Sequence, residues 1–117
     1  MTVSAKTRTI TIHADRELDL AGSLIVRIAV PPNTLSARVV VHKTANGSWG
    51  GSIPIESEHG AYATPVVIAD PGSSVLSAHA ALGVDALDGH GYIVLKPISS
   101  GSGSVRASVV FTVIDED

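Results

Sequence analysis

Residues 104–114 read Ser-Val-Arg-Ala-Ser-Val-Val-Phe-Thr-Val-Ile, and this stretch decides the fold class. Side chains alternate between the two faces of a strand. As a strand, the stretch has one wholly apolar face, formed by Val105, Ala107, Val109, Phe111 and Val113. The opposite face is mixed, because it combines Val110 and Ile114 with Arg106, Ser108 and Thr112. A strand in a small monomer usually keeps one face wet, so the second face predicts a neighbouring subunit.

Shorter alternating runs precede this stretch, and turn signals separate them. They predict strands over residues 7–13, 23–30, 36–43, 52–55, 63–69 and 91–97, with a short strand near 18–20. Residues 74–82 fit two interpretations, because Ser73 and Gly83 would also cap and stop a helix. We predict a strand there, since the neighbouring segments are strands. Asn46-Gly47 and Gly50-Gly51 predict a connection with positive φ angles, and Asp70-Pro71-Gly72 predicts a turn.

About eight strands with little or no helix predict an all-β protein, an antiparallel β-sandwich or jelly roll, with a small barrel as a further possibility. The 117 residues suit a single domain over 1–117. Residues 1–6 are interpreted as an N-terminal arm. Residues 115–117, Asp-Glu-Asp, are interpreted as an acidic tail.

Composition limits the kinds of partner that the chain is expected to bind. Hydrophobic residues make up 44% of the sequence but charged residues only 16%, against a usual charged share of about 25%. Part of the surface is therefore expected to be covered by protein. A net charge of −3 with scattered Lys and Arg argues against nucleic acid. No apolar run approaches the roughly 18 residues of a membrane span, and residues 1–8 show no secretory signal. Cysteine is absent.

Neither a metal site nor a catalytic site is predicted. The five histidines, His13, His42, His59, His79 and His90, have no spacing typical of metal ligands on one strand. Asp85 and Asp88 supply too few oxygens for calcium and fit a tight turn instead. Serine occurs without the Gly-x-Ser-x-Gly elbow, and the glycine-rich loops neither open a helix nor contain a suitable lysine. We therefore expect no enzyme activity and no cofactor.

Trp49 is the only tryptophan and lies among glycines. Its ring would either stack on a sugar or close one end of the sandwich. The first interpretation makes the protein a carbohydrate-binding module or lectin, with His59 and Tyr62 beside Trp49. The low aromatic content, 3%, argues against a lectin.

Two of the predicted strands have a second face that is partly apolar, and these faces supply candidate interface residues. On residues 23–30 these are Ile25 and Arg27, and on residues 104–114 they are Val110 and Ile114. A closed symmetric oligomer, a dimer or trimer, would cover such faces and protect exposed strand edges.

In general character the chain resembles small virion structural proteins of tailed phages, such as capsid decoration or cement proteins and tail or fibre β domains. The features of this resemblance are the absence of cysteine, the richness in Ala, Val, Ser and Gly, the Pro31-Pro32 stop and the Ser-Gly loops. They extend over the whole chain but form no motif, so no functional residue is carried over. The resemblance implies a non-enzymatic structural subunit that oligomerises or decorates a capsid or tail, and a location in the virion.

Overall fold

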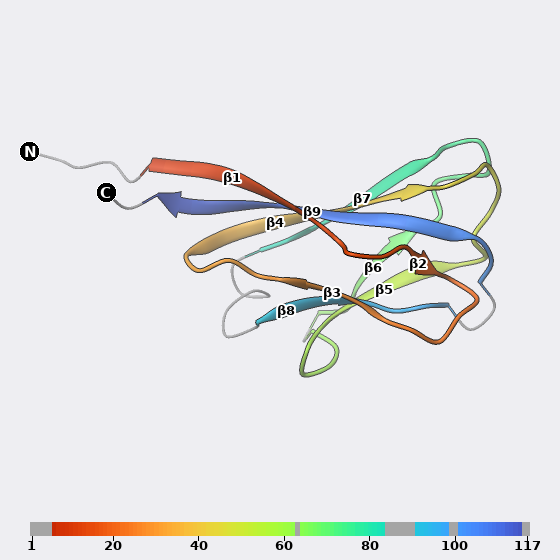
Figure 1. The fold of residues 1–117 in the computed structure, drawn as a ribbon, viewed down its shortest axis with the longest axis horizontal. Coiled ribbons are helices and arrows are strands. Elements are labelled where there is room, and N and C mark those ends of the chain that lie inside the picture. Colours follow the sequence, from red (N-terminus) through yellow and green to blue (C-terminus); the bar gives the residue numbers. More distant parts are fainter. Residues whose placement is uncertain (1–5, 63, 84–90, 99–100, 116–117) are drawn as a thin grey trace, which may run out of the picture.

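The computed structural model describes residues 6–62, 64–83, 91–98 and 101–115. These residues form two antiparallel β-sheets packed face to face, without helix (Figure 1). The strands are β1 (Lys6–His13), β2 (Leu18–Asp19), β3 (Val26–Ala29), β4 (Thr34–Lys43), β5 (Ser52–Ser57), β6 (Val66–Ala69), β7 (Ser77–Leu82), β8 (Tyr92–Leu95) and β9 (Ser104–Asp115). The large sheet has the order β1-β9-β4-β7, with β2 also paired to β9, and the small sheet has the order β3-β8-β5-β6.

The strand pairs are nested within one another. Strand β2 pairs with β9, β3 with β8, β4 with β7, and β5 with β6. This is the pattern of one long hairpin wrapped into two sheets, the jelly roll. Strand β1 pairs with β9 beyond β2 and lengthens the edge of the large sheet. Of the predicted architectures, the structure therefore shows the sandwich with jelly-roll topology, and the small barrel was wrong.

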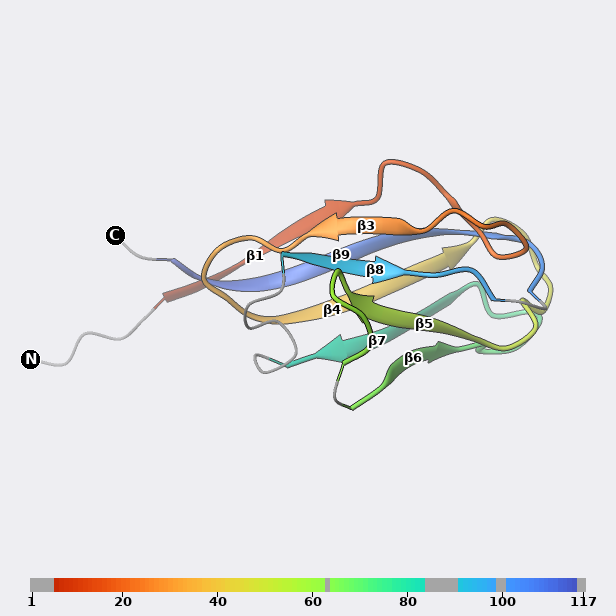
Figure 2. The same cartoon turned by 90° about the horizontal axis from the view of Figure 1, so that it is seen from below.

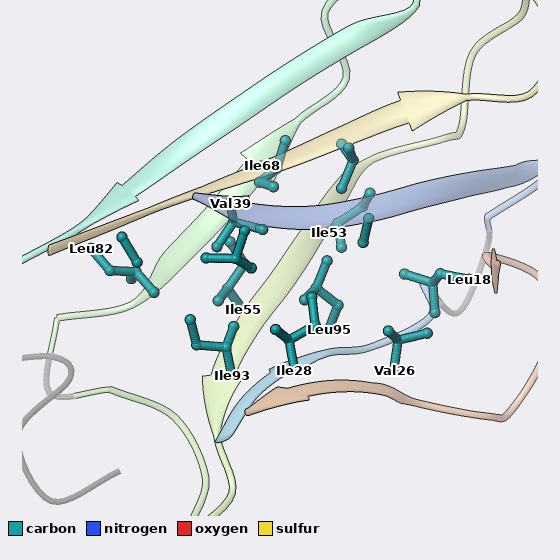
Figure 3. Close-up of a cluster of buried hydrophobic side chains, with 14 of the residues drawn as sticks. Leu18, Val26, Ile28, Val39, Ile53, Ile55, Ile68, Leu82, Ile93 and Leu95 are labelled. Carbon is teal, nitrogen blue, oxygen red and sulfur yellow. The ribbon is translucent and has the colours of Figure 1, made fainter. Parts of the chain in front are cut away.

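The strand that decided the fold class lies inside the large sheet, between β1 and β4. Its apolar face is buried as predicted, with Val105, Ala107, Val109, Phe111 and Val113 all in the core. Figure 3 shows the matching side chains of both sheets pointing into the space between them, among them Val39 from β4 and Ile53 and Ile55 from β5. The core thus lies between two sheets that each contribute alternate residues.

Residues 77–82 form strand β7, which confirms the strand interpretation for these residues, whereas residues 74–76 precede the strand. Because Leu82 and Ala80 face Ala37 and Val39 of β4, the small alanines fill the narrow margin of the core. The strand places every second residue there, an alternation that a helix would not provide.

Lys6 was predicted to belong to the N-terminal arm and Asp115 to the acidic tail, but both are strand residues. Lys6 already belongs to β1, and it pairs with Asp115 at the end of β9. The start of β1 and the end of β9 lie at the same end of the sandwich, and the β4–β5 connection lies at the other (Figures 1 and 2). In the part of the chain that is described, no helix is long and apolar enough to cross a membrane.

Candidate functional site

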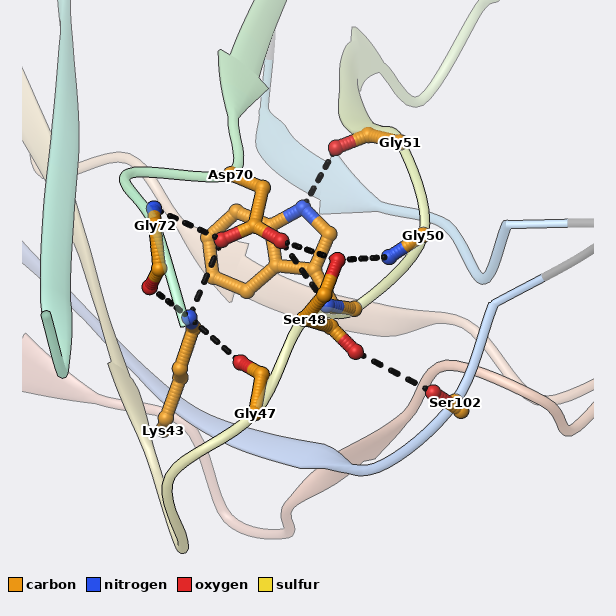
Figure 4. Close-up of polar contacts among 9 residues, drawn as sticks. Lys43, Gly47, Ser48, Gly50, Gly51, Asp70, Gly72 and Ser102 are labelled. Carbon is orange, nitrogen blue, oxygen red and sulfur yellow. Dashed lines mark hydrogen bonds and ion pairs between the residues drawn. The ribbon is translucent and has the colours of Figure 1, made fainter. Parts of the chain in front are cut away.

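A polar cluster (Figure 4) lies at the β4–β5 connection, at the end of the sandwich opposite the start of β1 and the end of β9 (Figures 1 and 2). Its cation is Lys43, the last residue of β4, whose side chain is only 4% exposed. The ammonium group donates to the carbonyl oxygens of Gly47 and Gly72, both at 2.6 Å, and to Oδ1 of Asp70 at 2.9 Å. All three of its protons are therefore used within the protein. The positive φ of Gly47, 136°, confirms the turn predicted there.

Asp70, which follows β6, is the counter-ion of Lys43. Its Oδ2 accepts hydrogen bonds from the Ser48 hydroxyl at 2.7 Å and the Trp49 backbone N–H at 3.0 Å. Its Oδ1 also accepts from the Gly72 backbone N–H at 3.1 Å. The hydrogen bond from Ser48, followed by that from Lys43, holds the pKa of the Asp70 carboxyl far below its usual range. The carboxylate is thus held ionised by donors from two different loops.

The Trp49 indole completes the cluster. The ring is 2% exposed, and its Nε1–H donates to the Gly51 carbonyl oxygen at 2.6 Å. The Lys43 ammonium lies 5.2 Å from the ring centroid, within the range of a cation–π interaction. A pocket of about 180 Å³ adjoins the cluster. Because every charged group of the cluster is satisfied internally, we assign the cluster to the fold and not to a ligand.

Ser48→Ala should lower the free energy of unfolding by about 1 kcal/mol at neutral pH, because one donor to the Asp70 carboxylate is lost. The pKa of Asp70 should then rise toward its usual value. The difference from the native protein should consequently be largest at neutral pH and shrink as the pH falls, since protonation removes the charge that Ser48 stabilises. Urea unfolding at several pH values measures this. Ser102→Ala is the control, because its hydroxyl donates to the uncharged Ser48 carbonyl oxygen instead, and its effect should not vary with pH.

The structure does not bring together the three residues proposed for carbohydrate binding. Trp49 precedes β5 and His59 follows it, so they are separated by the length of this six-residue strand, roughly 20 Å. The Trp49 ring is buried and presents no face for stacking, so it closes the end of the sandwich, which is the other interpretation of this residue. Tyr62 is also buried, which raises the pKa of its phenol. His59 is exposed, and its Nε2 lies 3.7 Å from Oε1 of Glu58.

The four candidate interface residues lie on opposite sides of the sandwich. Arg27 belongs to the outer face of the small sheet, and Ile25 lies just before β3 and is exposed beside this face. Val110 and Ile114 belong to the outer face of the large sheet, where both are half-buried, and Val110 lies between Thr11 of β1 and Arg38 of β4. The structure therefore offers two separate surfaces and not one.

The outer face of the small sheet is the more apolar of the two surfaces. Here Ile25, Tyr92 and Val67 are 41%, 39% and 50% exposed, and they come from or beside three different strands. Pro54 lies directly opposite Val67 and continues the apolar surface across β5. We call Ile25, Pro54, Val67 and Tyr92 the apolar patch. Sequence analysis identified only Ile25 of these, because the pairing of β5 with β6 and β8 is not readable from alternation alone.

Charged side chains cover the middle of the same sheet face. Val94 points outward from β8 between Arg27 and Glu56, yet it is buried. The Arg27 guanidinium lies 5.4 Å from the Tyr92 ring centroid, and Lys96 pairs with Glu56 at 3.0 Å. The stems of such long side chains shield apolar atoms while their charges stay in water. The apolar patch thus surrounds a charged centre.

The described histidines of the strands lie on the outer face of the large sheet. His13, His42 and His79 are exposed there, and His42 Nδ1 lies 2.7 Å from the Ser77 hydroxyl. Within the described residues, no three His, Asp or Glu side chains come together as metal ligands would. Asp85, Asp88 and His90 lie outside the described residues.

No family model and no curated protein matches the chain. Among solved structures, the chain is similar to the crystal structure of the SPBc2 prophage-derived protein YomS, with a TM-score of 0.55. The match covers 96% of this chain and 99% of that chain, at 12% sequence identity. At this identity the likeness shows the fold alone. Over 96% of its length, the chain is thus similar in its all-β fold to a prophage-derived protein.

Proposed function

We propose that the protein is a non-enzymatic structural subunit that self-associates and joins a larger protein assembly, a phage virion. The observation that carries this proposal is the apolar patch. Three large apolar side chains, each more than a third exposed, share one sheet face. Exposed apolar side chains that share one sheet face around a charged centre support a contact with another protein. The partner is protein, either another copy or the surface of a capsid or tail.

Two further observations support the proposal. The chain is similar in fold to a prophage-derived protein over nearly all of its length. The jelly roll is also a fold of viral capsid domains, although lectin domains use it too. The Trp49 ring is buried, which removes the observation on which a lectin function would rest. We therefore favour the structural subunit over the lectin.

Val67→Asp tests the apolar patch. A carboxylate at this exposed position should leave the fold intact. It should lower the average mass of the species in solution, because the carboxylate would have to be desolvated in any contact between copies. Sedimentation velocity over a range of concentrations measures the mass, and circular dichroism monitors the fold.

Val75→Asp is the matched control, since Val75 is similarly exposed, 46%, but lies before β7 and outside the patch. Val110→Asp tests the outer face of the large sheet in the same way, with Arg38 opposite to accommodate the charge. Equal masses for the native protein and all three variants would contradict the assignment of these faces to protein contacts.

A further inference from the structure

Strand β1 is the long open edge of the large sheet. Among the described strands it pairs with β9 alone, over its full length from Lys6 to His13 and without a register shift. Its sequence, Lys-Thr-Arg-Thr-Ile-Thr-Ile-His, contains no proline. Charges, prolines and bulges are the usual devices that protect an edge from further pairing. Residues 9–12 of this edge, Thr-Ile-Thr-Ile, carry none of them.

Two hydrogen bonds fix which backbone groups of β1 face the open edge. The Ala14 N–H donates to the Ala107 carbonyl oxygen. On the other side of β9, the Ile114 N–H donates to the backbone carbonyl oxygen of Asn33. Successive residues of a strand direct their N–H and C=O groups to alternate sides. Ile10 and Ile12 therefore bond to β9. The groups that point away from β9 belong to Thr7, Thr9, Thr11 and His13.

We infer that this edge pairs antiparallel with β1 of a second copy, so that two large sheets join into one. The inference rests on the proposed function, because it names a contact of the self-associating subunit in addition to the apolar patch. The occupant must be a strand, since only a strand satisfies a row of backbone N–H and C=O groups. A second copy can supply this strand, because β1 can pair antiparallel with another β1 in a register that the next residues define.

Charge excludes two registers of this pairing, and the number of backbone groups paired selects among the others. An axis at Thr7 or Arg8 would place Lys6 or Arg8 opposite a like charge of the second copy, which is unfavourable. An axis at Ile10 places Thr9 opposite Thr11 and Thr7 opposite His13 of the second copy. This register pairs every outward-directed backbone group of β1, and it places Lys6 and Arg8 opposite Ala14 and Ile12.

The same register brings the two Ile10 side chains together on the core side of the joined sheet. Ile10 is half-buried at the margin of the core in one copy. Contact with its counterpart would complete its burial, so the two cores would become continuous across the axis. The threonines would form a row of cross-strand pairs on the outer face, an arrangement that stabilises sheets.

A single cysteine tests this geometry directly. Ile10 and its counterpart would form a non-hydrogen-bonded pair with Cα atoms about 4.5 Å apart, and a disulfide needs about 4.4–6.8 Å. The chain has no cysteine of its own, so Ile10→Cys provides one thiol per copy. Mild oxidation should convert it completely to a covalent dimer. Ala80→Cys is the control, because Ala80 is half-buried on the opposite edge strand, β7, and should not cross-link.

Thr11→Pro provides the second test. The Thr11 N–H is not used by β9, so a proline there should leave the strand intact and remove a donor from the open edge. We expect the mass of the native dimer to fall by half with an unchanged β spectrum. A native oligomer that resists Thr11→Pro and fails to cross-link through Ile10→Cys would overturn this inference but not the proposed function. A trimer would do the same. A native monomer would overturn both.

Discussion

Asp70→Asn is expected to lower the free energy of unfolding by about 3 kcal/mol, because removal of one partner leaves a buried charge without compensation. Lys43 would keep its two carbonyl acceptors but lose its counter-ion. The amide would also turn its NH₂ group toward donors, since both carboxylate oxygens now accept hydrogen bonds. Urea unfolding followed by Trp49 fluorescence measures the loss.

Glu56→Gln is the matched control for this prediction. Glu56 also pairs with a lysine, Lys96, but that lysine side chain is 45% exposed. Exposed pairs contribute about 0–1 kcal/mol, so Glu56→Gln should change stability little. If the two variants behaved alike, the Lys43–Asp70 pair would be an ordinary surface ion pair and the cluster would not hold the end of the sandwich together.

The same residue gives the protein a defined response to acid. The pKa of Asp70 is lower in the folded chain than in the unfolded chain, so the unfolded chain binds a proton first as the pH falls. The stabilisation from Asp70 is therefore complete above about pH 5 and is lost progressively below the unfolded value of about 4. Asp70→Asn should remove this part of the acid dependence, so its stability should fall less steeply between neutral and acid pH.

Trp49→Ala is expected to lower the free energy of unfolding by about 3 to 5 kcal/mol, the usual cost of deleting a buried ring. The variant would lose the hydrogen bond from Nε1–H to Gly51 and the contact between the ring and Lys43. Because this substitution removes the only tryptophan, unfolding must be followed by circular dichroism.

Trp49→Phe separates volume from hydrogen bonding, since it keeps most of the ring and loses Nε1–H. It should cost clearly less than Trp49→Ala. An alanine variant as stable as the native protein would show that the ring is peripheral, and it would return Trp49 to consideration as a sugar-stacking residue.

Alternation along the strands predicted the fold class because the pattern of residues 104–114 is local. The same stretch could not distinguish a jelly roll from another sandwich, because that depends on which strands pair. The nested pairs β3–β8 and β4–β7 join residues far apart in the sequence. Residues 74–82 were ambiguous for a related reason, since only the contact with β4 favours the strand over a helix.

The polar cluster was predicted in its parts but not as a whole. The glycine turns at residues 46–51 and the Asp70-Pro71-Gly72 turn were both readable from the sequence, and closing the sandwich was one of two roles predicted for Trp49. The pairing of Lys43 with Asp70 was not, because nothing local links residues 27 positions apart. Likewise Ile25 and Val110 were both assigned to the partly apolar face of a strand. The sequence does not tell which sheet a strand joins, so it could not show that the two residues lie on opposite sides of the sandwich.

The absolute mass of the native chain in solution, by light scattering after size-exclusion chromatography, tests the central claim most directly. The chain has a mass of 12.0 kDa. A structural subunit that pairs through β1 should give twice this mass at the lowest measurable concentration, with larger species appearing as concentration rises. A single species of 12.0 kDa at every concentration would contradict both the self-association of the subunit and its contact through β1.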